Sequence, residues 1–339
     1  MDAEIFGLMP DGGEVQRVAI SGGGLTAQVI GWGAVIQDLR LTGHDHPLVL
    51  GFEDFAAYPA HSPYFGAIAG RYANRIAQGR FVIDGKTHQA DTNFLGKHAL
   101  HGGSDGFGRR LWKLEKAGVD FVTLSYQAGD GEMGFPGNLR VQCSYSMKPE
   151  GRFIVELSAR TDAPTLCNLA HHSYFNLDDG GRTDALGHVM RIDAGAYLPV
   201  DDELIPTGDV LRVEGTRFDF RTARPIRNGD GAAQRPYDHN FCLSAARGPL
   251  KRAAHVKGAS SGVEMEVWTT EPGLQFYDGV GTARDVPGLG GVIYGAHAGF
   301  CLEAQIWPDA PSRPYFPQAL LRPNEIYSQT TEYRFRLTR

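Results

Sequence analysis

Two adjacent histidines stand in the stretch NLAHHSYFNL at residues 168–177, within a segment, 165–177, that is predicted to be a β-strand. Successive side chains of a strand point to opposite faces, so His171 and His172 are predicted to lie in different surroundings. His172 shares its face with Tyr174 and Asn176, whereas His171 shares its face with mainly apolar residues. The strand pattern therefore predicts that His172 faces a polar site. A structural histidine on each face is the alternative.

Glu303 stands in the middle of the apolar, alternating stretch FCLEAQI at residues 300–306. Burial of a carboxylate is costly unless the group is paired, hydrogen-bonded or catalytic. A buried ion pair is the structural alternative. If the fold brings Glu303 and His172 together, a carboxylate and an imidazole can act as a general acid/base pair. These two residues are therefore the candidate catalytic residues.

Several other segments carry side chains that suit a polar, uncharged ligand. The segment GRYANRIAQGRF at 70–81 supplies guanidinium and amide groups that can donate hydrogen bonds to hydroxyls or carboxylates, and a solvated turn is its alternative. The segments GKHALHGG, PYDHNFCL and PGLQFY add imidazole, carboxylate and amide groups next to aromatic residues. Sugars are recognised by such a mixture. The candidate binding residues are Arg71, Asn74, Arg75, His101, Asp238 and Gln275.

The segment GKHALHGG also raises the question of a metal, because His98 and His101 have the spacing HxxH. A zinc site needs a third and usually a fourth ligand, and no convincing set is present in the sequence. The glycine pair after His101 suggests instead a loop that lets a ligand come close. No dinucleotide fingerprint, P-loop or nucleophile elbow is present. We therefore expect neither a metal nor a cofactor.

The segments that carry these residues are predicted to be antiparallel β-strands. Forty-four glycines and 19 prolines separate many short apolar-polar alternations, and helical periodicity is almost absent apart from a turn or two near residue 55. Alternation predicts one hairpin from 139–147 and 152–160 and a second over 80–89, where Asp84-Gly85 suits a tight turn. SGGGL at 21–25 is predicted to be another hairpin turn. The sequence indicates one large antiparallel β-sandwich, with residues 1–339 as a single domain.

Composition and charge exclude several classes of partner. The formal net charge is −6 and no basic stripe is present, which argues against nucleic acid or an anionic membrane. No run approaches the ~18 apolar residues of a membrane span. The first residues are acidic and lack the features of a signal peptide. We expect a cytoplasmic protein, a monomer or weak homodimer, with reduced thiols at Cys143, Cys167, Cys242 and Cys301.

Taken in order, these segments resemble the aldose 1-epimerase (galactose mutarotase) family. The matching blocks are GRYANRIAQGRFVIDGK, ALHGG, HHSYFNL, DHNF, PGLQFY and CLEAQIWPDAP followed by LRPNEIY, and they span residues 70 to 327. The resemblance implies a β-supersandwich fold. It also implies interconversion of the α and β anomers of a free sugar such as galactose or glucose.

The resemblance further implies a role for each candidate residue. Glu303 matches the catalytic base and His172, which precedes Ser-Tyr-Phe-Asn-Leu, matches the catalytic acid. The positions that match sugar contacts are Asn74, Arg75, His101, Asp238 and Gln275. One position departs from the pattern, because relatives usually carry asparagine where this chain has His171. We expect that change to alter packing or hydrogen bonding behind the site more than the chemistry.

Exchange of anomers requires loss of a proton from the C1 hydroxyl and delivery of a proton to the ring oxygen, which a carboxylate and an imidazole can perform. Burial is expected to raise the pKa of Glu303 and make it a stronger base. Three rival readings remain. A glycoside hydrolase would use Glu303 and Asp238 as two carboxylates. A hexose-6-phosphate epimerase would need basic groups for the phosphate, and a non-catalytic sugar-binding module would not need His172 opposite Glu303.

Overall fold

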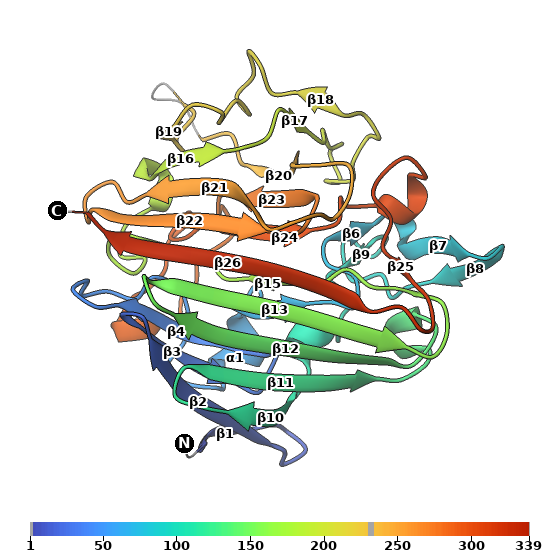
Figure 1. The fold of residues 1–339 in the computed structure, drawn as a ribbon, viewed down its shortest axis with the longest axis horizontal. Coiled ribbons are helices and arrows are strands. Elements are labelled where there is room, and N and C mark those ends of the chain that lie inside the picture. The colour runs from blue at the N-terminus through green and yellow to red at the C-terminus, as the bar shows by residue number, and fades with distance from the viewer. Residues whose placement is uncertain (1–2, 230–233, 339) are drawn as a thin grey trace.

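A computed structural model of the chain describes residues 3–229 and 234–338. Figure 1 shows that these residues form a sandwich of twisted sheets with both tight turns and long loops between strands and very little helix. The strand pairings in the three large sheets are antiparallel. The all-β prediction is therefore confirmed. Within the described residues, no helix has the length and apolar character needed to cross a membrane.

The largest sheet has nine strands, and the C-terminal strand β26 lies at its centre (Figure 1). Its strand order is β10 (Lys113–Ala117), β11 (Phe121–Ala128), β12 (Leu139–Lys148), β13 (Arg152–Thr161), β26 (Tyr327–Leu337), β22 (Val263–Thr269), β21 (Lys251–Lys257), β16 (Val189–Ile192) and β19 (Arg224–Pro225). β26 pairs with β13 on one side and with β22 on the other. The C-terminal strand thus joins two halves of the sheet that are distant in the sequence.

Two further sheets pack behind the first. One has the order β1 (Glu4–Leu8), β2 (Glu14–Gly22), β3 (Leu25–Ile30) and β4 (Val35–Leu41). The other has the order β18 (Leu211–Arg212), β17 (Ala196–Tyr197), β20 (Asp238–Cys242), β23 (Gly273–Tyr277) and β24 (Cys301–Gln305). One cluster of buried apolar side chains includes residues of all three sheets, among them Val18, Val141 and Phe276. The three sheets therefore share a core.

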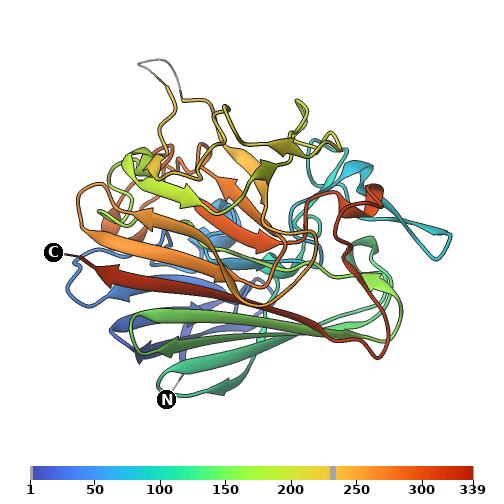
Figure 2. The same ribbon diagram turned by 45° about the horizontal axis from the view of Figure 1, so that its top comes forward.

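Four small two-stranded sheets complete the strand structure. They pair β5 (Ala67–Ala69) with β15 (Ala170–His172), β6 (Arg75–Ile76) with β9 (Ala99–Leu100), β7 (Arg80–Ile83) with β8 (Lys86–Gln89), and β14 (Thr165–Leu166) with β25 (Leu320–Leu321). The hairpin of β7 and β8 projects from one end of the sandwich in both Figure 1 and Figure 2. Its turn has positive φ at Asp84 and Gly85, as the predicted tight turn requires.

The helices are single turns. The α-helix is α1 (Ala57–His61), and the 3-10 helices are η1 (Ala77–Gly79), η2 (Phe107–Arg109), η3 (Glu132–Gly134), η4 (Ala185–Gly187), η5 (Leu289–Gly291) and η6 (Ala310–Ser312). The predicted turn near residue 55 corresponds to α1. Because the helices are so short, strands and loops supply nearly all of the positions that face the site.

The predicted hairpin of residues 139–147 and 152–160 is present, and its apolar and polar side chains alternate between its two faces as expected. In β12 the buried positions are Leu139, Val141, Cys143, Tyr145 and Met147, and polar residues stand between them. Across the β12–β13 ladder, the partners Phe153, Val155, Leu157 and Ala159 are buried as well, and Thr161 opposite Leu139 is partly buried. The period of two thus directs one face of this hairpin into the shared core.

The prediction of one continuous strand over 165–177 is wrong. The structure has the short strands β14 and β15 there, with irregular backbone between and after them. The break is a change of pairing partner, since β14 pairs with β25, Asn168 forms an isolated parallel bridge with Tyr72, and β15 pairs with β5. The Asn168 side chain supports this crossing, because it accepts a hydrogen bond from the N–H of Ile306 and donates one to the carbonyl of Ala73.

Candidate active site

One face of the sheet β20–β23–β24 carries three of the predicted residues. Gln275 in β23 lies opposite Glu303 in β24, and Asp238 in β20 lies opposite Tyr277, two residues further along β23. Alternate residues of paired strands point to the same side of a sheet. Asp238, Gln275 and Glu303 therefore project toward the same side.

A cleft of about 500 Å³ lies over this face. Six of the predicted residues line it: Asn74, Arg75, His101, His172, Asp238 and Glu303. The seventh, Gln275, lies against the cleft and donates a hydrogen bond to Asp238. The structure thus brings together all the candidates named for catalysis and all but Arg71 of those named for binding. Their roles remain predictions.

Glu303 and His172 face each other, with Glu303 Oε2 3.5 Å from His172 Nε2. Both side chains are buried, and Glu303 Oε2 has no hydrogen-bond partner in the described part of the chain. Burial, with a smaller effect of Asp238, raises the pKa of Glu303 well above its usual range. Burial also lowers the pKa of His172 to about 4. These shifts favour one shared proton over two separated charges.

Neighbouring side chains hold the His172 ring in place. Tyr64 stacks on one side with ring centroids 5.8 Å apart, and Tyr174 stacks at 5.1 Å. Cys301 Sγ lies 3.5 Å from His172 Nδ1. The hydroxyl of Tyr174 donates to the carbonyl of Pro63, which fixes that aromatic ring as well. These contacts keep Nε2 directed toward Glu303.

A chain of polar contacts runs along the other wall. Asp238 accepts from Gln275 Nε2 at 2.6 Å through one oxygen and from an Arg75 nitrogen at 3.0 Å through the other. The Arg75 guanidinium also lies over the ring of Phe94, 4.6 Å from its centroid. In the part of the chain that the structure describes, Gln275 Oε1 and Arg75 Nε make no hydrogen bond. Fixed groups with spare hydrogen-bonding capacity suit a ligand rich in hydroxyls.

His101 presents a hydrogen-bond donor to the cleft. Its Nδ1 accepts from the backbone N–H of Asn74 at 3.2 Å, so in the neutral ring the proton lies on Nε2. Burial chiefly, with His172 and Arg75, lowers the pKa of His101 well below its usual value and keeps the ring neutral. Asn74 Oδ1 in turn accepts from the N–H of Arg75, which orients the Asn74 amide.

Three side chains of the cleft are close enough together to be considered as metal ligands. His101, His172 and Glu303 have potential ligand atoms within 4.8 Å of one another. A metal on His101 Nε2 would move its proton to Nδ1, where it would oppose the N–H of Asn74. The donor set therefore fits proton transfer better than metal binding. His98, the other histidine of the HxxH spacing, contacts Gln78 and Glu203 instead.

Two expectations about the loops near the cleft are wrong. Arg71 does not face the cleft; its buried guanidinium donates to the carbonyls of Gly129, Pro136 and Gly137 and thereby anchors that loop. The glycine after His101 does not make room for a ligand. A Cβ at Gly102 would lie 2.0 Å from the carbonyl oxygen of Gly70, so the backbone of a neighbouring segment occupies that space.

His171 lies on the opposite side of β15 from His172, as the strand pattern predicts. Its Nδ1 is 3.1 Å from the hydroxyl of Tyr333 in β26, and its Nε2 is 2.9 Å from Ser173 Oγ. Burial lowers its pKa to about 3, so the ring is neutral. His171 therefore links β15 to the nine-stranded sheet and does not touch the cleft.

Sequence reasoning missed part of the cleft wall. Loop residues contribute Tyr64, Leu204, Pro236 and Val280. No periodicity or motif marks these positions, because their segments reach the cleft only through contacts between distant parts of the chain. The proline next to Tyr64 indicates a loop but carries no information about which site the loop reaches.

Comparisons with known proteins agree with this arrangement. Residues 16–334 match the family described as Aldose 1-epimerase. The galactose mutarotase of Rattus norvegicus is 42% identical over 98% of this chain and 97% of its own length, and the aldose 1-epimerase of Escherichia coli (strain K12) is 36% identical over 97% of each chain. The crystal structure of the GalM/aldose epimerase homologue from C. elegans superimposes with a TM-score of 0.88 at 28% identity, covering 96% of this chain and 100% of that one. The chain belongs to the aldose 1-epimerase family.

Proposed function

We propose that this protein is an aldose 1-epimerase that interconverts the α and β anomers of free aldoses in the cleft above β20, β23 and β24. The observation that carries the proposal is the buried pair of Glu303 and His172, 3.5 Å apart and directed at each other. Curated relatives that match almost the whole chain are named galactose mutarotase and aldose 1-epimerase. Both names describe this reaction class.

The pair supplies the one proton that the reaction needs. Ring opening starts from the form of the pair that has its one proton on His172 Nε2 and Glu303 as a carboxylate; Nε2 gives that proton to the ring oxygen while the carboxylate takes the proton of the C1 hydroxyl. The bond between C1 and the ring oxygen breaks, and a carbonyl forms at C1. After rotation about the C1–C2 bond, the two proton transfers run backward onto the other face of the carbonyl. The protein regains its starting protonation and no electrons leave the sugar.

The remaining polar residues are proposed to bind the sugar hydroxyls. Arg75 and the Nε2–H of His101 are donors, and Asp238 and Gln275 Oε1 are acceptors. Tyr64 adds an apolar ring face to the cleft wall. A sugar held by fixed donors and acceptors keeps C1 between the acid and the base, which supplies the positioning part of catalysis.

The geometry favours this reaction over the three alternatives. Among the described residues that line the cleft, Arg75 is the one arginine or lysine, and it is paired with Asp238, so no basic cluster awaits a phosphate. Both oxygens of Asp238 already accept hydrogen bonds, and an imidazole rather than a second carboxylate faces Glu303. A module that only binds sugars has no need for that pair.

Polarimetry on freshly dissolved sugars tests the proposal. We expect the protein to accelerate mutarotation of α-galactose or α-glucose well above the spontaneous rate and to leave glucose 6-phosphate and aryl glycosides unchanged. If the protein accelerated mutarotation of glucose 6-phosphate alone, the result would instead support a hexose-6-phosphate epimerase. Release of the aryl group would support a glycoside hydrolase.

We also propose that the chain acts as one domain in the cytoplasm, as a monomer or weak homodimer, without metal or cofactor. The shared core of the three sheets supports the single domain. Four free cysteines, three of them buried, support a reducing compartment. Sedimentation over a range of concentrations tests the oligomeric state, and retained folding of a half chain such as 1–160 would contradict the single domain.

A further inference from the structure

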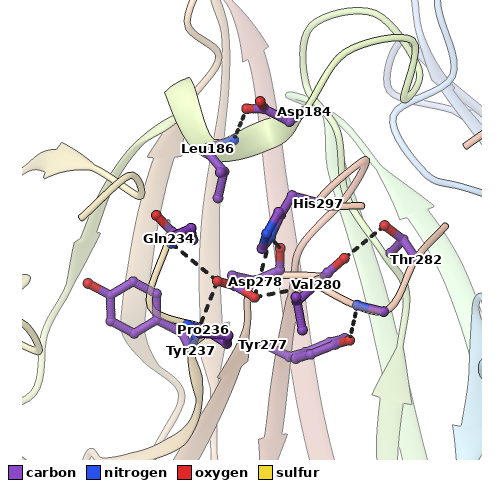
Figure 3. A network of polar contacts seen from close by, with 12 residues as sticks. Asp184, Leu186, Gln234, Pro236, Tyr237, Tyr277, Asp278, Val280, Thr282 and His297 are labelled. Atoms are coloured by element: carbon purple, nitrogen blue, oxygen red, sulfur yellow. Dashed lines mark hydrogen bonds and ion pairs between the residues drawn. The ribbon is translucent and has the colours of Figure 1, made fainter. Parts of the chain in front are cut away.

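A buried carboxylate lies just outside the cleft, in a network that the catalytic pair does not use. Asp278 follows Tyr277, the last residue of β23, and is 1% exposed. Figure 3 shows its carboxylate between three segments of chain. It accepts from the N–H of Tyr237 at 3.1 Å and from Gln234 Nε2 at 3.2 Å through one oxygen, and from the N–H of Val280 at 3.2 Å through the other.

His297 closes the network from a third segment. Its Nδ1 lies 3.5 Å from the Asp278 carboxylate and 3.0 Å from the Asp278 carbonyl oxygen. The backbone N–H of His297 donates to Gly279, which ties this segment to the turn after β23. The hydroxyl of Tyr277 accepts from the N–H of Gly281 in the same turn. The turn is therefore fixed at both of its ends.

The segments that Asp278 joins are segments of the cleft wall. Pro236, Tyr277 and Val280 all line the cleft, and Tyr237 is followed directly by Asp238. The N–H of Asp278 also donates to the carbonyl of Tyr237. Any shift of Tyr237 relative to the turn would move Asp238 relative to Tyr277. Glu303 and His172 stand on β24 and β15 and make no contact with this carboxylate.

We propose that Asp278 is a positioning residue for sugar binding, holding Tyr237 and the turn of residues 278–282 together so that Asp238 and Tyr277 present a fixed wall to the sugar. The proposal rests on the function proposed above for the cleft. Because the network touches the binding wall and not the catalytic pair, its loss should weaken binding of the sugar and leave turnover of the bound sugar nearly intact.

The chain contains a matched control. Asp178 is a largely buried carboxylate that, like Asp278, accepts backbone N–H groups, here from Ala259, Ser260 and Ser261 at 2.9–3.0 Å, and that lies beside a histidine, His188, at 3.8 Å. None of these residues lines the cleft. A merely structural role for such a carboxylate should therefore appear equally at both positions, whereas a positioning role should appear only at Asp278.

The test compares Asp278→Asn with Asp178→Asn by polarimetry on α-galactose over a range of concentrations. An amide at 278 keeps one acceptor but turns N–H groups toward the donors of Tyr237 or Val280. We expect KM to rise about tenfold or more with kcat within about threefold for Asp278→Asn. For Asp178→Asn we expect a lower melting temperature and a KM within about twofold. Equal effects on KM, or a loss confined to kcat at position 278, would overturn the proposal.

Two further measurements keep the test decisive. If Asp278→Asn does not fold, His297→Asn is measured in its place. We expect its KM to rise a few-fold at nearly constant kcat, and an unchanged KM would overturn the proposal. Calorimetric titration of each folded variant with galactose separates this inference from the reaction itself. Weaker binding by the Asp278 variant alone would support positioning even if the unaltered protein did not accelerate mutarotation.

Discussion

Glu303 Oε2 lies 3.5 Å from His172 Nε2, although the two residues belong to strands of different sheets. Burial of either side chain alone in its charged form would be unfavourable, because the charged group would lose its hydration. Together they can hold one proton between them and pass it to a bound molecule. This relationship explains why a glutamate interrupts an apolar strand, and the following predictions depend on it.

The first prediction concerns the pH dependence of kcat/KM. The active pair holds one proton, so activity is lost at low pH when a second proton binds, and at high pH when the last one leaves. Because burial lowers the pKa of His172 to about 4, the acid limb of kcat/KM should lie well below pH 6.5, and because burial raises the pKa of Glu303, the alkaline limb should lie well above the usual range of a glutamate. Polarimetry with rates extrapolated to zero buffer checks this. An acid limb centred near 6.5, where an unperturbed histidine titrates, would contradict it.

The second prediction uses His171 as the neighbour of His172 on the opposite face. His171→Asn loses a buried hydrogen bond to Tyr333 or Ser173 and should cost about 1–2 kcal/mol of unfolding free energy. Its kcat should stay within a few-fold of the unaltered protein. Thermal unfolding and initial-rate polarimetry measure the two effects. A loss of turnover as large as that of His172→Asn would show that the assignment of the two faces is wrong.

The third prediction separates the two arginines of the segment 70–81. Lysine cannot reproduce the several hydrogen bonds of a guanidinium. Arg71→Lys should therefore lower stability by about 2 kcal/mol or more through the loop at 129–137 and leave KM nearly unchanged. Arg75→Lys should raise KM for the sugar roughly tenfold with a smaller effect on stability. Kinetics and denaturant unfolding of both variants provide the comparison. A raised KM for Arg71→Lys together with a mainly lower stability for Arg75→Lys would show that Arg71, and not Arg75, binds the sugar.

Much of this site can be predicted from the sequence, because strands have a fixed period. Parity places His172 on the polar face and His171 on the apolar face, which the structure shows to be the cleft and the core. The position of Glu303 opposite Gln275 comes from the pairing of β23 with β24, which the sequence did not predict. The prediction of strand length fails where the chain changes its pairing partner, from β25 at β14 to Tyr72 at Asn168 and then to β5 at β15. The length of the predicted strand is therefore wrong although its parity holds near His172.

The parts that could not be predicted depend on contacts between distant segments. Arg71 has the residue type of a sugar-binding group, yet its guanidinium is occupied by carbonyls of a loop some 60 residues further on. Tyr64 reaches the cleft from a loop without a repeating pattern. Asp278 looks like an ordinary turn residue until its partners at Tyr237 and His297 are seen. Residue type suggests what a group can do, but only packing decides which partner it finds.

The fourth prediction concerns metal removal. His101 holds its Nε2 proton because Nδ1 accepts from the N–H of Asn74, and we propose that this Nε2–H donates to the sugar rather than giving way to a metal. Exhaustive chelation followed by gel filtration should leave mutarotation unchanged. A loss of activity that added zinc restores would contradict this account and would assign His101, His172 and Glu303 to a metal.

The most direct test of the central claim is initial-rate polarimetry on His172→Asn, Glu303→Gln and the double variant, with sugar binding followed by calorimetry. Each single substitution should lower kcat by roughly 10²–10⁴ while binding survives, because each removes one end of the proton transfer. The double variant should be little worse than either single one, since the two groups act as a unit. Near-normal turnover in both single variants, or a double variant that loses the product of the two single effects, would contradict the assignment of Glu303 and His172 as one acid/base pair.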